Sequence, residues 1–125
     1  MIRTGADDDT LFVSNTAFAA VDGGSGSDTL RLVGGGQMLD LTTSNSEIDG
    51  IERINLTGAG DNTLALRARD LLDLSDSSNE LRVFGNAGDS VDLVGGWTAG
   101  TLAGGFQTYT LGAATILVDT DIFVT

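Results

Sequence analysis

The sequence predicts an all-β protein, a β-solenoid of short strands that is closed by a C-terminal antiparallel β-hairpin. The main observation is a triplet of two apolar residues flanking one other residue, which returns about every nine or ten positions; such triplets start at residues 30, 39, 54, 64, 72, 81 and 91. Because side chains alternate between the two faces of a strand, each triplet predicts a very short strand. No such strand buries its apolar face alone, so successive strands should stack around a shared core.

The composition supports this fold class. The 125 residues include 18 glycines and no proline, and 41% of the chain is apolar. Many glycines without proline favour tight turns at positive φ between paired strands over a flexible linker. The length and apolar content predict a single domain over residues 1–125.

Within that domain we expect four segments. Residues 4–42 form regular coils, each with two strands and two glycine-rich turns. Residues 43–50 interrupt the repeat and predict an insertion, after which residues 51–96 form less regular coils. Residues 67–72 are compatible with a helical turn, but the pattern is too short to predict a helix. Residues 97–125 form a glycine-rich loop and the hairpin that caps the last coil.

The strongest chemical motif is the segment Gly-Gly-Ser-Gly-Ser-Asp-Thr-Leu at residues 23–30. Its glycines permit a turn whose carbonyl groups converge, and Asp28 adds a carboxylate where the turn ends. A related turn at residues 4–11 ends with Asp9, 19 residues before Asp28. Stacked turns of this kind offer the carbonyl and carboxylate oxygens that a hard divalent cation requires.

The motif at residues 23–31 resembles the glycine- and aspartate-rich nonapeptide of RTX (repeats-in-toxin) proteins. The resemblance implies a parallel β-roll with Ca²⁺ between successive turns, in a family of secreted bacterial toxins, proteases, epimerases and large adhesins. Two further repeats, at residues 58–64 and 85–91, are degenerate, and Asn62 stands where a ligand Asp is expected. The candidate metal residues are Gly5, Asp7, Asp9, Gly23, Gly24, Gly26, Asp28, Asp61 and Asp89. The alternative is that these residues only shape turns in a solenoid whose ion sites have decayed.

Charge and residue usage restrict the function further. The net charge of −12 disfavours nucleic acid and anionic membrane surfaces as partners, and we expect no membrane insertion. The chain has no His, Cys or Lys, which excludes the common nucleophilic pairs, the usual zinc sites and Schiff-base chemistry, so we expect no enzyme. The N-terminus lacks the apolar core of a signal peptide. We therefore expect a piece of a larger exported protein, located outside the cell at a bacterial surface.

Two non-enzymatic functions follow. The first is a calcium-binding structural module of a secreted adhesin or RTX-type protein, which folds and stiffens when Ca²⁺ binds. The second is a module that recognises a surface polysaccharide, with Trp97, Phe106 and Tyr109 as its aromatic platform. A self-assembling solenoid that stacks on neighbouring copies or domains is a third possibility. Core or cap packing is the competing interpretation of the three aromatic residues.

Overall fold

The computed structural model describes residues 2–3, 5, 7–13, 20–41, 47–57, 60–74 and 79–125. In these residues the protein is all-β, with three sheets and one short helix. The seven-stranded sheet has the order β11 (Thr98–Ala103), β12 (Phe106–Leu111), β13 (Ala114–Asp119), β9 (Glu80–Phe84), β7 (Arg53–Asn55), β4 (Thr29–Leu32) and β2 (Thr10–Val13). The four-stranded sheet has the order β14 (Phe123–Val124), β10 (Ser90–Val94), β8 (Thr63–Arg67) and β5 (Met38–Asp40). The third sheet contains β1 (Ile2–Arg3), β3 (Ala20–Asp22) and β6 (Glu47–Asp49).

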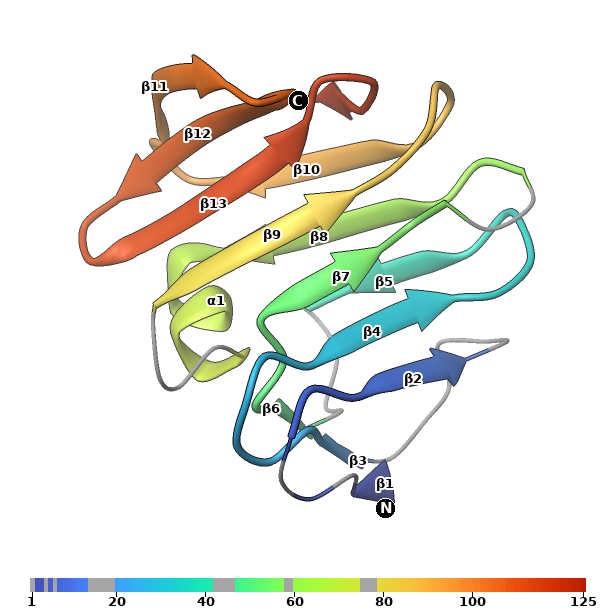
Figure 1. Ribbon diagram of the computed structural model, residues 1–125. Coiled ribbons are helices and arrows are strands. Elements are labelled where there is room, and N and C mark those ends of the chain that lie inside the picture. Colours follow the sequence, from blue (N-terminus) through green and yellow to red (C-terminus); the bar gives the residue numbers. More distant parts are fainter. Residues whose placement is uncertain are drawn as a thin grey trace.

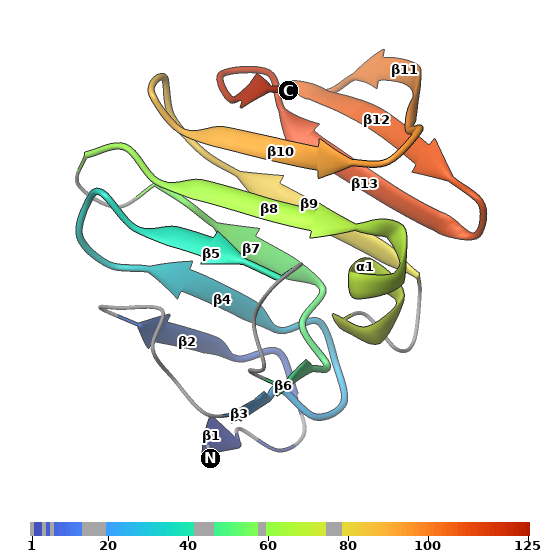
Figure 2. The same cartoon turned by 180° about the vertical axis from the view of Figure 1, so that it is seen from behind.

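From β3 to β8 the chain visits the three sheets in turn, and after β8 helix α1 takes the place of a strand of the third sheet. Strands β3, β4 and β5 make one passage, and β6, β7 and β8 make the next, with each new strand parallel to its predecessor in the same sheet. The two larger sheets face each other, and the short third sheet lies at the N-terminal end (Figures 1 and 2). The expectation of two-strand coils is therefore wrong, because three sheets are visited in these passages.

The register between passages is strict although their length is not. One inward row of the seven-stranded sheet contains Leu11, Leu30, Ile54, Val83 and Val118, which are paired in this order. The intervals along this row therefore grow from 19 to 24, 29 and 35 residues. Apolar pairing across neighbouring strands holds the register, while the connections between strands absorb the added residues.

The expected insertion at residues 43–50 is wrong in part. Residues 47–49 form β6, which pairs with β3 in the register Val21↔Ile48, so this part of the segment continues a sheet. Residues 42–46 lie outside the described part of the chain.

The triplet at residues 72–74 is not a strand. It belongs to helix α1 (Ala68–Leu74), which follows β8 directly. The Asp70 carboxylate accepts a hydrogen bond from the Arg67 backbone N–H at 2.8 Å, a side-chain contact that favours helix initiation, and also pairs with the Arg67 side chain. Leu71 and Leu74 are fully buried, so the helix covers the core beside β6. The residue pattern could not distinguish a helix from a strand here, because both structures place Leu72 and Leu74 near the core.

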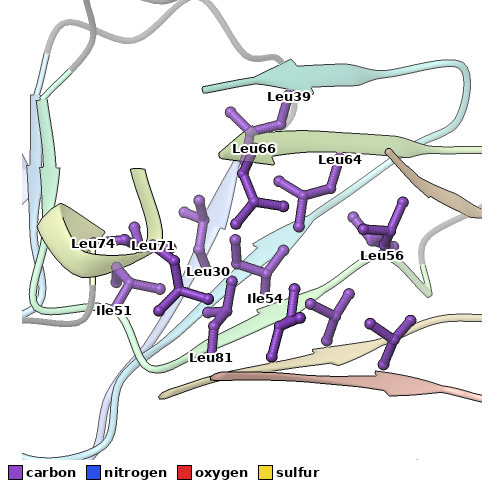
Figure 3. Packing of buried hydrophobic residues seen from close by; sticks show 14 of the residues in the cluster. Leu30, Leu39, Ile51, Ile54, Leu56, Leu64, Leu66, Leu71, Leu74 and Leu81 are labelled. Carbon is purple, nitrogen blue, oxygen red and sulfur yellow. The ribbon is translucent and has the colours of Figure 1, made fainter. Parts of the chain in front are cut away.

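The core is a continuous aliphatic cluster between the two larger sheets and α1 (Figure 3). Leu30, Ile54 and Leu81 come from the seven-stranded sheet, and Leu64 and Leu66 come from β8. The described residues contain no helix that is long and apolar enough to cross a membrane.

The predicted C-terminal antiparallel hairpin is confirmed, but it does not end the sheet, because β11 lies beyond β12. Strands β12 and β13 pair antiparallel, from Phe106↔Asp119 to Leu111↔Ala114, and β13 is parallel to β9. The expected loop before it is wrong in part, because β11 occupies residues 98–103 and pairs antiparallel with β12.

Candidate metal centre

A ladder of acidic side chains follows one corner of the molecule. Asp9, Asp28 and Glu52 each stand directly before a strand of the seven-stranded sheet, namely β2, β4 and β7. The Asp9 backbone N–H donates to Asp28 Oδ1 at 2.8 Å, and the Asp28 backbone N–H donates to Glu52 Oε2 at 2.9 Å. The Asp28 and Glu52 carboxylates thus bind the backbone of the preceding passage, and the first of these bonds confirms that Asp9 and Asp28 lie one above the other.

Glycines allow the turns of this corner to pack backbone against backbone. A Cβ at Gly24 would lie 2.0 Å from the Gly5 carbonyl oxygen, and a Cβ at Gly26 would lie 2.6 Å from the Asp7 carbonyl oxygen. Asp7 itself has φ of 80°, so it adopts a glycine-like conformation at the place where it replaces a glycine of the repeat. The structure therefore brings together Gly5, Asp7 and Asp9 with Gly24, Gly26 and Asp28.

Gly23, in the same turn as Gly24, links this corner to the next passage of the chain. It is buried, and its N–H donates to the Asp49 carbonyl oxygen at 3.0 Å. A Cβ at this position would meet both the Gly50 carbonyl oxygen, at 2.2 Å, and Asp28 Oδ2, at 2.8 Å. A backbone oxygen and a carboxylate oxygen therefore border the same small space, which only glycine leaves open.

The Asp28 carboxylate is in an unfavourable electrostatic environment. Asp28 has no exposed surface, and neither Asp28 Oδ2 nor Asp9 Oδ2, both buried, has a hydrogen-bond partner. Burial raises the pKa of Asp28, and the negative charges of Asp9 and Asp8 raise this pKa further. The hydrogen bond from the Asp9 backbone and the charge of Arg53 act in the opposite direction without cancelling the rise. Nearby, Asp8 accepts a hydrogen bond from the Ser27 backbone N–H at 2.8 Å.

A second polar ladder follows the corner before the four-stranded sheet. Gln37, Asn62 and Asp89 stand directly before β5, β8 and β10. The Gln37 N–H donates to Asn62 Oδ1 at 3.0 Å, and the Asn62 N–H donates to Asp89 Oδ1 at 2.9 Å. The next position, before β14, is the apolar residue Ile122, which packs where a side chain at Gly85 would lie. The second ladder therefore ends at Asp89.

Hydrogen bonds satisfy Asn62 and Asp89 in this second ladder. Asn62 Nδ2 donates to the carbonyl oxygens of Gly34 and Leu56, both at 3.1 Å. Asp89 Oδ2 accepts the Asn86 N–H at 2.7 Å, so both carboxylate oxygens of Asp89 have partners.

The two corners therefore differ in their fit to a cation. Asp28 and Asp9 present buried carboxylate oxygens that lack a donor. In the second corner the buried oxygen that lacks a donor is the neutral amide oxygen Oε1 of Gln37, and the amide group of Asn62 supplies donors to the carbonyls around it. Asp61 and Asp89 belong to the second corner, apart from Asp9 and Asp28, and their role as metal ligands stays a prediction. Among the described residues no three acidic side chains are grouped as a metal cluster, so a cation beside Asp28 would need backbone carbonyl ligands.

Three residues of the first corner were not predicted from the sequence: Asp8, Gly50 and Glu52. A usable signal was present. Glu52 stands two positions before the buried Ile54, just as Asp28 stands two positions before Leu30. Because side chains at such positions share one face, this offset predicts that the polar residue points inward.

The three candidate aromatic ligands do not form one platform. Phe106 and Tyr109 are three positions apart on β12, so their side chains lie on opposite faces of the sheet. Phe106 packs edge-on against Phe84 at 5.4 Å and lies 5.0 Å from the Arg82 guanidinium. Trp97 and Tyr109 pack against the core instead, and Trp97 Nε1 donates to the Val94 carbonyl oxygen. The expected shared binding face for a polysaccharide is therefore wrong.

Comparisons with protein-family models, curated proteins and solved structures found no match to this chain.

Proposed function

We propose that this chain is a calcium-binding structural module of a secreted bacterial adhesin or RTX-type protein, with stacked coils of the β-roll kind. One Ca²⁺ binds between the turn that ends at Asp9 and the turn that ends at Asp28, and it links the two passages. The observation that carries the proposal is the pair of buried carboxylate oxygens, Asp9 Oδ2 and Asp28 Oδ2, which lack hydrogen-bond donors.

The chemistry of the corner supports a hard cation. A buried carboxylate without a partner is unfavourable, and a divalent cation would offset both that penalty and the repulsion among Asp8, Asp9 and Asp28. The Gly50 carbonyl oxygen, which lies beside Asp28 Oδ2 in the space left by Gly23, is a neutral ligand of the type that Ca²⁺ prefers. Asp9 and Asp28 therefore hold the cation in this proposal, and backbone carbonyls complete its shell.

Calcium binding is coupled to folding in this proposal. The unfolded chain cannot present stacked turns, and its net charge of −12 repels itself. At a free Ca²⁺ concentration 100 times the dissociation constant, one site would add about 2.7 kcal/mol to the free energy of unfolding. A cell exterior rich in calcium would then favour the folded module, which agrees with a secreted location at the bacterial surface.

The test is thermal unfolding in chelator and in millimolar CaCl2, with calorimetric titration of Ca²⁺ into the chelated protein. We expect a higher melting temperature in calcium and a saturable binding heat. Asp61→Asn is the matched control: Asp61 is an exposed acid of a repeat turn at the second corner, so the variant should keep the full calcium response. Equal melting temperatures in both buffers together with no binding heat would remove the proposal.

A further inference from the structure

The outer face of the seven-stranded sheet contains a hollow of about 370 Å³. Ile54 and Val83 are fully buried in the core, so the residues next to them on β7 and β9, namely Arg53, Arg82 and Phe84, project from the opposite, outer face. Figure 1 shows β4, β7 and β9 side by side on this face. The hollow is lined by residues of β7, of β9 and of the turns before β4 and β7: Ser27, Glu52, Arg53, Glu80, Arg82 and Phe84.

Two arginines stand directly opposite each other in this hollow. Arg53 on β7 pairs with Arg82 on β9 in the register of the sheet. Like charges that face each other across neighbouring strands destabilise a sheet. Positions at which a residue departs from what stability favours are characteristic of functional sites, so the arginine pair marks the hollow as a place where a ligand binds.

Neighbouring groups hold the lining side chains in place. Arg53 Nη2 donates to the Ser27 carbonyl oxygen at 3.0 Å, and the Arg82 guanidinium lies 5.0 Å from the centre of the Phe106 ring. Phe106 in turn packs edge-on against Phe84, with 5.4 Å between the ring centres. The two guanidinium groups and the Phe84 ring therefore have defined positions before any ligand arrives, which lowers the entropic cost of binding.

The polar groups of the hollow supply donors and acceptors in balance. The Arg53 and Arg82 guanidinium groups only donate hydrogen bonds, and the ionised Glu52 and Glu80 carboxylates only accept them. Glu52 Oε2 accepts the Asp28 N–H at 2.9 Å, and a carboxylate has room for further donors. The two positive and two negative charges cancel, so neither an anion nor a cation gains a net attraction. The complementary ligand is neutral and carries groups that both donate and accept, which is the property of hydroxyl groups.

The Phe84 ring adds an apolar surface to these polar groups. A hexopyranose has hydroxyl groups around its rim and apolar C–H groups on its faces, so it matches both parts of the lining. The volume of the hollow lies within the range of about 300–1,000 Å³ that is usual for small-molecule sites. Of the three aromatic residues expected from the sequence to bind a polysaccharide, Phe106 contacts this lining, and Trp97 and Tyr109 pack against the core instead.

We propose that this hollow binds a neutral hexopyranose unit of a glycan. Arg53 and Arg82 donate to hydroxyl oxygens, Glu52 and Glu80 accept hydroxyl protons, and a C–H face of the sugar packs on Phe84. Asp9 and Asp28 do not line the hollow, so this site is separate from the proposed calcium site.

Saturation-transfer-difference NMR with the methyl glycosides of glucose, galactose and mannose, in millimolar CaCl2, tests this site. We expect saturable binding of at least one glycoside. Arg82→Ala and Glu80→Ala should each raise its dissociation constant at least about tenfold, because each variant removes charge-assisted hydrogen bonds to hydroxyl groups. Arg31→Ala is the matched control: Arg31 is on β4, lies 5.6 Å from the Phe12 ring and does not line the hollow, so this variant should bind normally.

Circular dichroism of each variant ensures that a loss of binding does not reflect a loss of fold. If the natural protein binds none of the three glycosides, the proposal is overturned. A dissociation constant that Arg82→Ala and Glu80→Ala leave unchanged overturns it as well. Methyl glucuronide is the charged probe, and tighter binding of it than of methyl glucoside would show selection for an anion and overturn the assignment of a neutral sugar. None of these outcomes depends on the calcium response, so failure of sugar binding leaves the proposed metal site standing.

Discussion

Replacing Asp28 by Asn separates the two roles of this side chain. Asp28 Oδ1 accepts the Asp9 N–H at 2.8 Å, and an amide oxygen preserves that bond. The other oxygen, buried and without a donor, becomes an NH2 group. Asn62 shows the result at the equivalent place in the second corner, where the amide accepts the Gln37 N–H and donates to two carbonyl oxygens. The Gly50 carbonyl beside Gly23 offers an acceptor at the first corner.

The expected effect reverses with calcium. An unsatisfied buried polar group costs about 1–3 kcal/mol, so in chelator Asp28→Asn should raise the free energy of unfolding by about that amount. For a chain of this length the gain corresponds to roughly 3–10 °C in melting temperature. Saturating calcium should then raise the stability of the natural protein, by about 2.7 kcal/mol at 100 times its dissociation constant, and leave the variant unchanged.

Thermal denaturation followed by circular dichroism measures both effects on the natural chain, Asp28→Asn and the control Asp61→Asn. Four melting temperatures decide the outcome, namely those of the natural chain and of Asp28→Asn, each in chelator and in calcium. If Asp28→Asn melts below the natural protein in chelator while its native spectrum is unchanged, the argument that an unpartnered oxygen destabilises this corner is wrong. If the variant keeps the full calcium shift, Asp28 is not a ligand.

Three further predictions follow from the same contacts. Gly24→Ala should lower the melting temperature by about 10 °C, because Gly24 has φ of 77° and its Cβ would lie 2.0 Å from the Gly5 carbonyl oxygen. Gly36→Ala is the matched control: Gly36 has φ of 69° but no atom near its Cβ, so this variant should lose only about 1 kcal/mol of stability through backbone strain. Asn62→Asp should destabilise the protein by about 1–3 kcal/mol in urea unfolding, because it removes the donors to the carbonyl oxygens of Gly34 and Leu56. An unchanged urea midpoint would contradict the claim that these two hydrogen bonds stabilise the second corner. Folding raises the pKa of Asp28, chiefly by burial, so in chelator its contribution to the free energy of unfolding is present at low pH and is lost as the pH rises through the folded pKa. Subtracting the pH profile of stability of Asp28→Asn from that of the natural protein isolates this loss. A difference that does not change with pH would contradict the pKa shift.

The repeated triplet predicted the fold class because it records which residues face the core. Leu30, Leu64 and Leu81, the first residues of three triplets, are all fully buried. The number of strands per passage was not predictable, because β3 and β6 have only three residues each and carry no complete triplet. Helix α1 was missed for a related reason: a seven-residue helix with a buried Leu pair has the same local pattern as a buried strand.

The candidate site was predictable where backbone and side chain both left a trace in the sequence. The glycines at positions 23, 24 and 26 mark close backbone approach, and the 19-residue spacing of Asp9 and Asp28 matches the observed register of Thr10 with Thr29. The sequence did not show that the glycine and aspartate turns belong to two different corners. Asp89 follows the same glycine and aspartate pattern as Asp28, yet its strand joins the four-stranded sheet rather than the seven-stranded sheet.

At both corners, the residue directly before a strand determines which kind of partner, a donor, an acceptor or a cation, the corner needs. The side chain at this position points inward and binds the N–H of the preceding passage, whether it is Asp28, Asn62 or Asp89. Its second polar atom then determines the chemistry. In Asn62 that atom is a donor and meets carbonyl oxygens; in Asp89 it is an acceptor and meets the Asn86 N–H. In Asp28 it is an acceptor that has no donor, and a cation is a partner that such a charged oxygen can still bind.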